Sequence, residues 1–301
     1  MKMIGELAAL GAAVCWAGSA VLYKKGLLST KPISANIIRC LAVSVLQISF
    51  LMLLGKINLF AKLSTYTVVL ACLSGIIGFF LGDTLYMFSL KLMGVARAVP
   101  LTCIYPLFNI FLAAIIQGEK VTFYIVIGAV AIFFGVWLLS GREENVKVDG
   151  EKGSLVKGVI LALTTAILWS ISILMIDIAV TVPENAGFDV AFAVNTLRVS
   201  AATIILLISI PITDRKMDFL RMKRKSLSSI VFGGFIAITL GWFLLTFSFS
   251  SIPQSRAVPI SSASPLFSTL AGIFVLHEKV TFKVFLGSVV IMFGIFLVFM
   301  T

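Results

Sequence analysis

Two short polar stripes interrupt apolar stretches of the sequence, and they carry the chemistry that is easiest to recognise. Thr102, Tyr105 and Asn109 follow one another at intervals of three and four residues, so they share one face of a helix. The equivalent positions, 159 residues further along the chain, hold three serines: Ser261, Ser264 and Ser268. Such groups can line a wet cavity that holds a polar organic molecule, or they can hydrogen-bond one helix to another. We interpret both stripes as candidate cavity walls.

A proline lies beside each stripe, Pro106 beside the first and Pro265 beside the second. Proline has no backbone N–H, so inside a helix it frees a carbonyl group and bends the axis. A bend next to a row of hydroxyl groups would widen the space and add a hydrogen-bond acceptor to it. The sequence therefore predicts a helix break at each proline.

Aromatic side chains supply a second kind of binding group. Trp16 and Ser19 lie three residues apart in the first apolar stretch, and Trp169 and Ser172 repeat this spacing in the second half of the chain. An indole deep inside an apolar stretch can stack on an organic ligand and donate one hydrogen bond, or it can simply pack in the core. Two further candidate cavity residues, also aromatic, are Tyr86 and Trp242.

Four charged residues lie inside apolar stretches, where a charge usually needs a partner. Arg39 and Arg198 occupy equivalent places in the two halves, whereas Asp83 and Asp177 have no acidic counterpart. Counted from the same membrane face at 1.5 Å per residue, Arg39 and Asp83 lie about 9 and 12 Å deep, so we expect an ion pair. We expect Arg198 and Asp177 to pair similarly. The alternative is that Asp83 exchanges a proton with the aqueous phase.

The composition excludes several classes of protein. The chain of 301 residues is 60% hydrophobic with a mean hydropathy of +1.12, well above a soluble domain. Its net charge of +11 resides almost wholly in short breaks between apolar stretches, which is typical of membrane proteins and does not indicate nucleic-acid binding. Four isolated cysteines and one histidine form no metal or cofactor motif. We therefore predict no cofactor and no metal.

The apolar stretches predict ten membrane-spanning helices, because they are too long and too uniformly apolar for barrel strands. The expected spans are residues 4–24, 33–55, 66–91, 97–117, 121–140, 155–181, 188–211, 227–250, 256–276 and 280–300. The predicted fold class is an all-α integral membrane protein of two five-helix repeats. The first repeat comprises 1–141, a charged linker follows at 142–153, and the second repeat comprises 154–301.

The two halves are internally similar. Between residues 97–135 and 256–294, 17 of 39 positions are identical without a gap. An odd number of spans per copy places the second copy upside down relative to the first, and such inverted repeats build transporters with a site at the membrane midplane. Paired turn residues accompany the repeat and are expected to fix the turns: Glu119, Lys120, Glu278 and Lys279. Glycines at helical spacing, such as Gly128 and Gly135, predict close helix packing.

The distribution of basic residues predicts an orientation. The odd-numbered loops carry 17 Lys and Arg residues, and the loops on the side of the termini carry 5, counting the N-terminal tail. The positive-inside rule would then put the odd-numbered loops in the cytoplasm and both termini outside.

These features together resemble a known family. A first helix with tryptophan, a second helix with arginine, and the segment "YPLFNIFLAAIIQGEKVTFYIVIGAVAIFFGVWLL" are similar to EamA-type members of the drug/metabolite transporter superfamily. The segment "SPLFSTLAGIFVLHEKVTFKVFLGSVVIMFGIFLVF" repeats the pattern, with His277 in place of the usual glycine. The resemblance extends over nearly the whole chain.

The resemblance implies a multi-pass plasma-membrane transporter with ten helices, a central cavity and small organic solutes as substrates, often moved outward. It implies termini in the cytoplasm, opposite to the charge distribution, so the orientation stays open. The polar stripes favour neutral or zwitterionic solutes such as amino acids, related metabolites or drugs. Expected partners are the substrate, the bilayer and, if Asp83 titrates, protons.

Two alternatives belong to other classes of protein, an intramembrane enzyme and a non-transporting partner protein. "FLGD" at Asp83 lacks the first glycine of the G-x-G-D motif of aspartyl intramembrane proteases. Asp177 lacks a preceding tyrosine, and we therefore predict no enzymatic activity.

Overall fold

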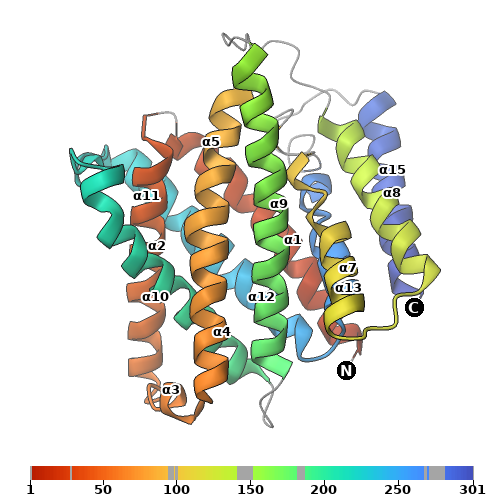
Figure 1. Ribbon diagram of the computed structural model, residues 1–301, viewed down its shortest axis with the longest axis horizontal. Helices are drawn as coiled ribbons and strands as arrows, with labels where there is room; N and C mark the ends of the chain where they lie inside the picture. Colours follow the sequence, from red (N-terminus) through yellow and green to blue (C-terminus); the bar gives the residue numbers. More distant parts are fainter. Residues whose placement is uncertain are drawn as a thin grey trace.

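The computed structural model describes residues 2–27, 29–93, 98, 101–140, 152–181, 187–267, 270 and 282–300. All regular secondary structure in these residues is helical, which confirms the predicted all-α class. Figure 1 shows a bundle of long, roughly parallel and antiparallel helices.

The helices of the first half lie close to the predicted spans. Their bounds are α1 Lys2–Leu27, α2 Pro32–Leu53, the short α3 Leu59–Lys62, α4 Thr65–Gly75, the π-helix η1 Ile76–Gly82, α5 Asp83–Met93, α7 Tyr105–Ile116 and α8 Phe123–Ser140. α4, η1 and α5 follow one another without a break, so they form the third span together.

The second half repeats this order. Its bounds are α9 Lys152–Thr181, α10 Phe188–Thr213, the 3₁₀ helix η2 Asp218–Arg221, α11 Arg224–Gly234, the π-helix η3 Phe235–Trp242, α12 Phe243–Phe249, α13 Gln254–Ser261 and α15 Phe282–Phe299. The uninterrupted series of α11, η3 and α12 corresponds to that of α4, η1 and α5.

The lengths and composition of the helices fit a membrane protein. In the described part of the chain, five helical stretches are long and apolar enough to cross a bilayer: Pro32–Leu53, Thr65–Ser89, Val156–Thr181, Phe188–Thr213 and Arg224–Phe249. Shorter apolar stretches are Tyr105–Ile116, Phe123–Leu138 and Phe285–Phe299. The count of ten spans remains a prediction.

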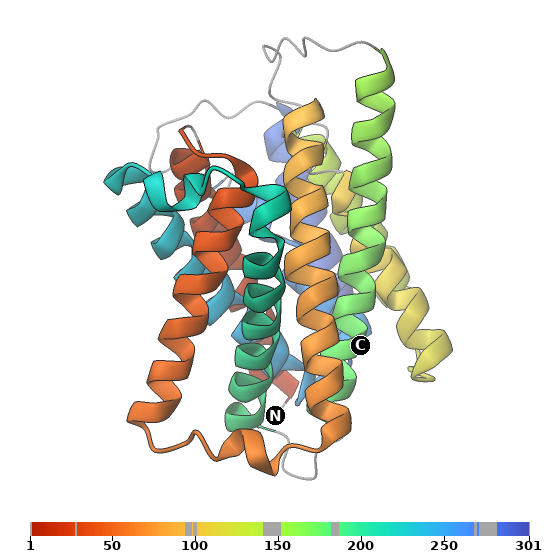
Figure 2. The ribbon, with the colours of Figure 1, turned by 60° about the vertical axis from the view of Figure 1, so that its left-hand side comes forward.

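The two halves interlock through their first and third spans. α1 packs on α11, η3 and α12 of the second half, and α9 packs on α4, η1 and α5 of the first. α2 contacts α10, and α8 lies along α15. Figures 1 and 2 show α1 and α9 running in opposite directions, α1 from the side of the two chain ends and α9 toward it. This is the arrangement expected of an inverted repeat.

The fourth span of each half is interrupted at the same place. Turns at 103–104 and 262–263 stand directly before the helical turns that contain Pro106 and Pro265. Each proline therefore lies in the first turn of a new helical segment, where its missing N–H costs nothing. The helix is thus interrupted at the predicted places, and the interruption is a turn just before each proline, after which the helix restarts.

Small residues allow the closest contacts between halves. A Cβ atom added at Gly128 would lie 2.7 Å from the Gly294 carbonyl oxygen, and one added at Gly135 would lie 2.8 Å from the Gly287 carbonyl oxygen. These distances are too short for a side chain, so α8 and α15 can approach only at glycine. The glycine spacing in the sequence predicted this close packing.

Candidate functional site

The π-helical segments in the third spans each present a backbone acceptor to the second span of their own half. Asn36 Nδ2 donates to the Phe79 carbonyl at 3.0 Å, and Asn195 Nδ2 donates to the Ile238 carbonyl at 2.9 Å. The two contacts are equivalent, because Asn195 and Ile238 each lie 159 residues after their counterparts. A π-helical turn leaves carbonyl groups without their usual partners and often marks a functional site.

Arg39 and Asp83 form a buried ion pair, as predicted from their depths. The two side chains are only 8% and 12% exposed. The second carboxylate oxygen of Asp83 accepts a hydrogen bond from Trp169 Nε1 at 3.0 Å. Asp83 therefore joins the second span of its own half to the sixth span of the other half.

Arg198 does not pair with Asp177, contrary to our expectation. Its Nε donates to Ser74 Oγ at 3.0 Å, and one terminal nitrogen donates to Asn195 Oδ1 at 3.3 Å. The reason is depth: Arg198 lies ten residues into α10, about 15 Å from its start, whereas Asp177 lies about 6 Å from the end of α9 on the same side.

The Arg198 guanidinium instead lies between two aromatic rings. Its central carbon is 4.6 Å from the centre of the Phe79 ring and 4.5 Å from that of Trp242. The negative faces of aromatic rings attract a cation. Phe79 comes from the first half and Trp242 from the second, so Arg198 occupies the interface between them.

The predicted aromatic cavity residues gather around this centre. Trp16 lies 5.2 Å from Trp242, Tyr86 lies 5.2 Å from Trp169, and Tyr105 lies 6.0 Å from Trp169, measured between ring centres. All but Tyr105 are partly exposed although they lie inside the bundle. Rings with accessible surface at the interface between two repeats are suited to contact an organic solute.

The predicted serines of the first and sixth spans make local contacts. Ser19 Oγ donates to the Trp16 carbonyl at 2.9 Å. Ser172 Oγ donates to the Ser74 carbonyl at 2.8 Å and joins α9 to α4. Both serines are buried; the bond of Ser172 joins two helices, whereas that of Ser19 stays within α1.

The residues of the polar stripes in the fourth and ninth spans differ in how far they are buried. Thr102 and Ser261 are buried, and Ser261 Oγ donates to the Val258 carbonyl at 2.9 Å. Ser264 is partly exposed, while Ser268 lies outside the described residues.

Asn109 starts a chain of buried amides that leads toward the side of the termini. Its Nδ2 donates to Gln254 Oε1 at 3.2 Å, Gln254 donates to Gln117, and Gln117 donates to the Asp177 carboxylate. Asp177 is thus tied to the fourth and ninth spans by amides and not by a cation. Each of these three hydrogen bonds joins one half to the other, so the chain crosses the interface between the halves three times.

Glu119 lies next to this chain of amides and makes a contact with the other half that the sequence did not predict. Its two carboxylate oxygens accept from the backbone N–H groups of Gln254 and Ser255, each at 3.1 Å. These donors are the first N–H groups of α13, which otherwise lack partners and carry partial positive charge. Glu119 therefore caps a helix of the other half; its counterpart Glu278 lies outside the described residues.

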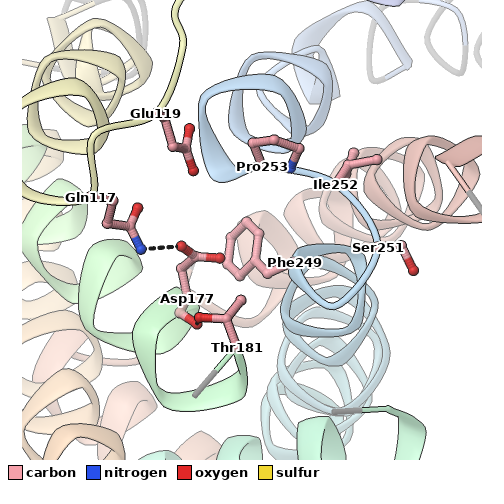
Figure 3. Close-up of a pocket in the computed structure, with 8 residues that line it drawn as sticks. All are labelled: Gln117, Glu119, Asp177, Thr181, Phe249, Ser251, Ile252 and Pro253. Atoms are coloured by element: carbon pink, nitrogen blue, oxygen red, sulfur yellow. Dashed lines mark hydrogen bonds between the residues drawn. The ribbon is translucent and has the colours of Figure 1, made fainter. Parts of the chain in front are cut away.

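A pocket of about 300 Å³ opens beside this cap. Figure 3 shows its lining, with Gln117 pointing toward the Asp177 carboxylate and Glu119 above them near Pro253. The other lining residues are Thr181, Phe249, Ser251 and Ile252. The pocket thus adjoins the Glu119 cap, at the end of the bundle where the termini lie.

A second cluster on the same side joins three spans. Arg256 forms an ion pair with Glu6, and its guanidinium donates to the Phe299 carbonyl at 2.8 Å. It therefore ties the start of α13 to the start of α1 and the end of α15.

In the described residues, no group of His, Cys, Asp and Glu could hold a metal ion.

Sequence reasoning missed several polar residues that complete this site. The residues are Asn36, Asn195, Ser74, Gln117, Gln254 and Glu6. Asn36 and Asn195 could have been found, because each precedes an intramembrane arginine by three residues in both halves. The others have no counterpart that would single them out.

Comparison with known proteins agrees with this architecture. The model of the EamA-like transporter family matches residues 3–141 and again residues 156–300. An uncharacterized transporter of Archaeoglobus fulgidus is 28% identical over 299 residues, 98% of either chain. The uncharacterized transporter YwfM of Bacillus subtilis is 27% identical over 173 residues, covering 57% of this chain and 53% of its own. A crystal structure with 17% identity has the same fold, with a TM-score of 0.78 over 97% of this chain and 95% of its own.

Proposed function

Because the chain belongs to the EamA-like transporter family, as a multi-pass protein of the plasma membrane, we propose that it carries small organic solutes by alternating access. In this mechanism the two repeats, 1–141 and 154–301, exchange conformations around a central site. The site then opens to one side of the membrane at a time. We further propose that the natural direction of transport is outward.

One observation carries this proposal, the partly exposed aromatic cluster between the two halves. Trp16, Tyr86, Trp169 and Trp242 come from four different spans and form two ring pairs, each joining one half to the other. Aromatic faces combined with a few fixed polar groups bind organic molecules of many shapes. Neutral or zwitterionic solutes such as amino acids and related metabolites fit this lining.

The contact of Glu119 with α13 is proposed as one closing contact of the cycle. It joins the end of the fourth span to the start of the ninth, so it closes the bundle on the side of the termini. Its donors are backbone groups, which water could satisfy if the contact opened. We propose that this contact breaks when the site opens toward that side.

The intramembrane-enzyme alternative receives no support from the two aspartates. Asp83 is bound by Arg39 and Trp169, and Asp177 is bound by Gln117 near the other end of the bundle. A paired-carboxylate site needs the two groups side by side. The chain's family relationship likewise favours a transporter that is not an enzyme.

Flux into proteoliposomes tests the proposed function. Purified protein is reconstituted, and labelled amino acids and related metabolites are scanned first for thermal stabilisation and then for counterflow. We expect at least one stabilising solute to exchange across the membrane faster than in protein-free vesicles. Stabilisation without any flux would show a binding protein and would refute transport.

Cysteine accessibility tests the proposed cavity separately. Cysteines at 102, 105, 109, 261, 264 and 268 are expected to react with a water-soluble thiol reagent in at least one conformation. The matched control is a cysteine at the lipid-facing position of Phe111, which is 62% exposed on the outside of the bundle. Reaction at that position alone would contradict the cavity.

Reporter fusions decide the orientation. A fusion after residue 220 reports the basic segment between α10 and α11, and a fusion after Thr301 reports the C-terminus. We propose the family's arrangement, with the termini in the cytoplasm. A cytoplasmic signal from the fusion after residue 220, with none after Thr301, would establish the opposite orientation.

A further inference from the structure

Arg198 is a buried cation for which the described part of the chain provides no carboxylate partner. The side chain is fully buried. Among the described residues it donates hydrogen bonds to the neutral groups of Ser74 and Asn195, and one terminal nitrogen, Nη2, has no hydrogen-bond partner there. An unpaired charge at this depth is costly, so its retention calls for an explanation.

The other buried arginines show how this fold usually neutralises a guanidinium. Arg39 pairs with Asp83, and Arg256 pairs with Glu6. Both acids come from a neighbouring span and are themselves almost completely buried. Arg198, by contrast, has no carboxylate in direct contact among the described residues, because Asp83, which acts on it electrostatically, is already paired with Arg39.

The internal repeat shows which acidic residue the second half lacks beside its arginine. Arg198 lies 159 residues after Arg39 and is its counterpart in the repeat. By the same offset, the counterpart of Asp83 is Trp242. The second half thus keeps the arginine and replaces its acid with an aromatic ring, which now covers the guanidinium at 4.5 Å. A cation–π contact stabilises a charge less than a carboxylate with two hydrogen bonds does.

Arg198 lies where inverted-repeat transporters bind their substrates, near the membrane midplane and between the two halves. It lies about 15 Å from the start of α10, near the middle of a hydrocarbon core of roughly 30 Å. It contacts Ser74 and Phe79 of the first half and Trp242 of the second. Its unpartnered Nη2 lies near Gly78, where an added Cβ atom would be 3.8 Å away.

Trp242 is the member of the aromatic cluster that contacts the guanidinium directly. One contact of the indole is with Arg198, and another is with Trp16, whose ring centre lies 5.2 Å away. Trp242 is itself partly exposed. A change in the side-chain angle of Trp242 would therefore uncover the guanidinium on the side of Trp16.

We propose that Arg198 binds the carboxylate group of the transported solute, with Phe79 and Trp242 holding the guanidinium when no substrate is bound. This inference rests on the proposed transport function and narrows its substrates to carboxylate-bearing molecules. The planar guanidinium matches a carboxylate with two parallel hydrogen bonds. A neutral or purely cationic solute would leave the charge unpaired.

Matched pairs of ligands test this assignment. The probes are neutral-side-chain L-amino acids and their primary amides, which differ only in the carboxylate. Thermal stabilisation of the intact protein and counterflow in proteoliposomes are measured for both members of each pair. We expect the acids to stabilise and exchange, and the amides to fail in both assays.

The variants connect the preference to Arg198. Arg198→Gln should weaken acid binding by about 10- to 100-fold, the range for losing a hydrogen bond to a charged group. Arg198→Lys keeps the charge but loses the planar fork, so an intermediate loss is expected. It also serves if the glutamine variant fails to fold. The matched control, Arg39→Gln with Asp83→Asn, removes the equivalent arginine together with its acid and should retain the preference for acids.

Several results would overturn the proposal. They are an amide that binds as tightly as its acid, a preference for acids that survives in Arg198→Gln, or a panel in which no carboxylate stabilises the wild-type protein. Flux without a preference for acids would refute only the role of Arg198 and leave the transport function intact. Binding that depends on Arg198 but comes without flux would support the site and refute transport.

Discussion

The ion pair between Arg39 and Asp83 makes the most direct prediction about stability. The side chains are 8% and 12% exposed, so solvent screens the pair very little. Asp83→Asn would leave the Arg39 charge buried without its carboxylate. Removing one member of a buried pair typically costs about 3–5 kcal/mol. Since Asn can keep the hydrogen bond from Trp169, we expect a loss near the lower end of that range.

The double variant gives this prediction its sharpest form. Arg39→Gln with Asp83→Asn replaces the two charges with neutral amides that can still hydrogen-bond. We expect the double variant to regain most of the stability that each single variant loses. Residues in contact commonly show a coupling energy of about 0.5–3 kcal/mol in such a cycle. The assay is thermal unfolding in one detergent, with wild type and the three variants measured side by side.

Additive losses would refute this reasoning, because they would show that the two charges do not stabilise each other. A different outcome bears on the alternative role of Asp83. If Asp83→Asn transports at the wild-type rate but loses its dependence on a pH gradient, Asp83 carries a proton in the cycle. Transport assays with and without an imposed gradient separate these two roles.

Two further predictions concern the packing of the halves and the closing contact. A Cβ atom at Gly75 would overlap the Arg198 carbonyl, so Gly75→Ala should clearly lower the unfolding temperature. The control is Gly18→Ala, which has open space around it and should leave the unfolding temperature unchanged. Equal effects of the two substitutions would refute the close approach at Gly75. Glu119→Ala removes the cap from the N–H groups of Gln254 and Ser255, which should cost about 1–2 kcal/mol and bias the protein toward opening on the terminus side. Cysteine labelling in the pocket of Figure 3 should then become faster, and an unchanged rate would show that the cap does not close this side.

The fold was largely predictable because its strongest signals are local. Apolar stretches of about twenty residues define spans in a bilayer, and the repeated "RAVP" and "EKVTF" segments reveal the duplication. The internal breaks were less accessible to sequence reasoning. Pro106 indicated an interruption, but nothing near Ile76 or Phe235 indicated the π-helical segments, of which η1 packs on α9 and η3 packs on α1 of the other half.

The charged residues show the same division. The pair of Arg39 and Asp83 was predictable because both lie at similar depth in adjacent spans of one half. The partners of Arg198 and Asp177 were not, because they are neutral groups and two of them, Ser74 and Gln117, come from the other half. Hydrophobic periodicity gives the depth of a residue in its span, but it does not tell which spans of opposite halves touch.

The contact of Glu119 is another one between opposite halves that the sequence did not predict, and it indicates how the duplicated structure could open and close. In the sequence, "GEK" reads as a tight turn that stays within its own half. In the structure the carboxylate crosses to the other half, where it satisfies the first two N–H groups of α13. A contact between a turn and a helix start is made of few groups, and its donors can be hydrated when it opens. It is therefore suited to form and break during transport, whereas the glycine-lined contact of α8 with α15 buries apolar surface and is suited to stay closed.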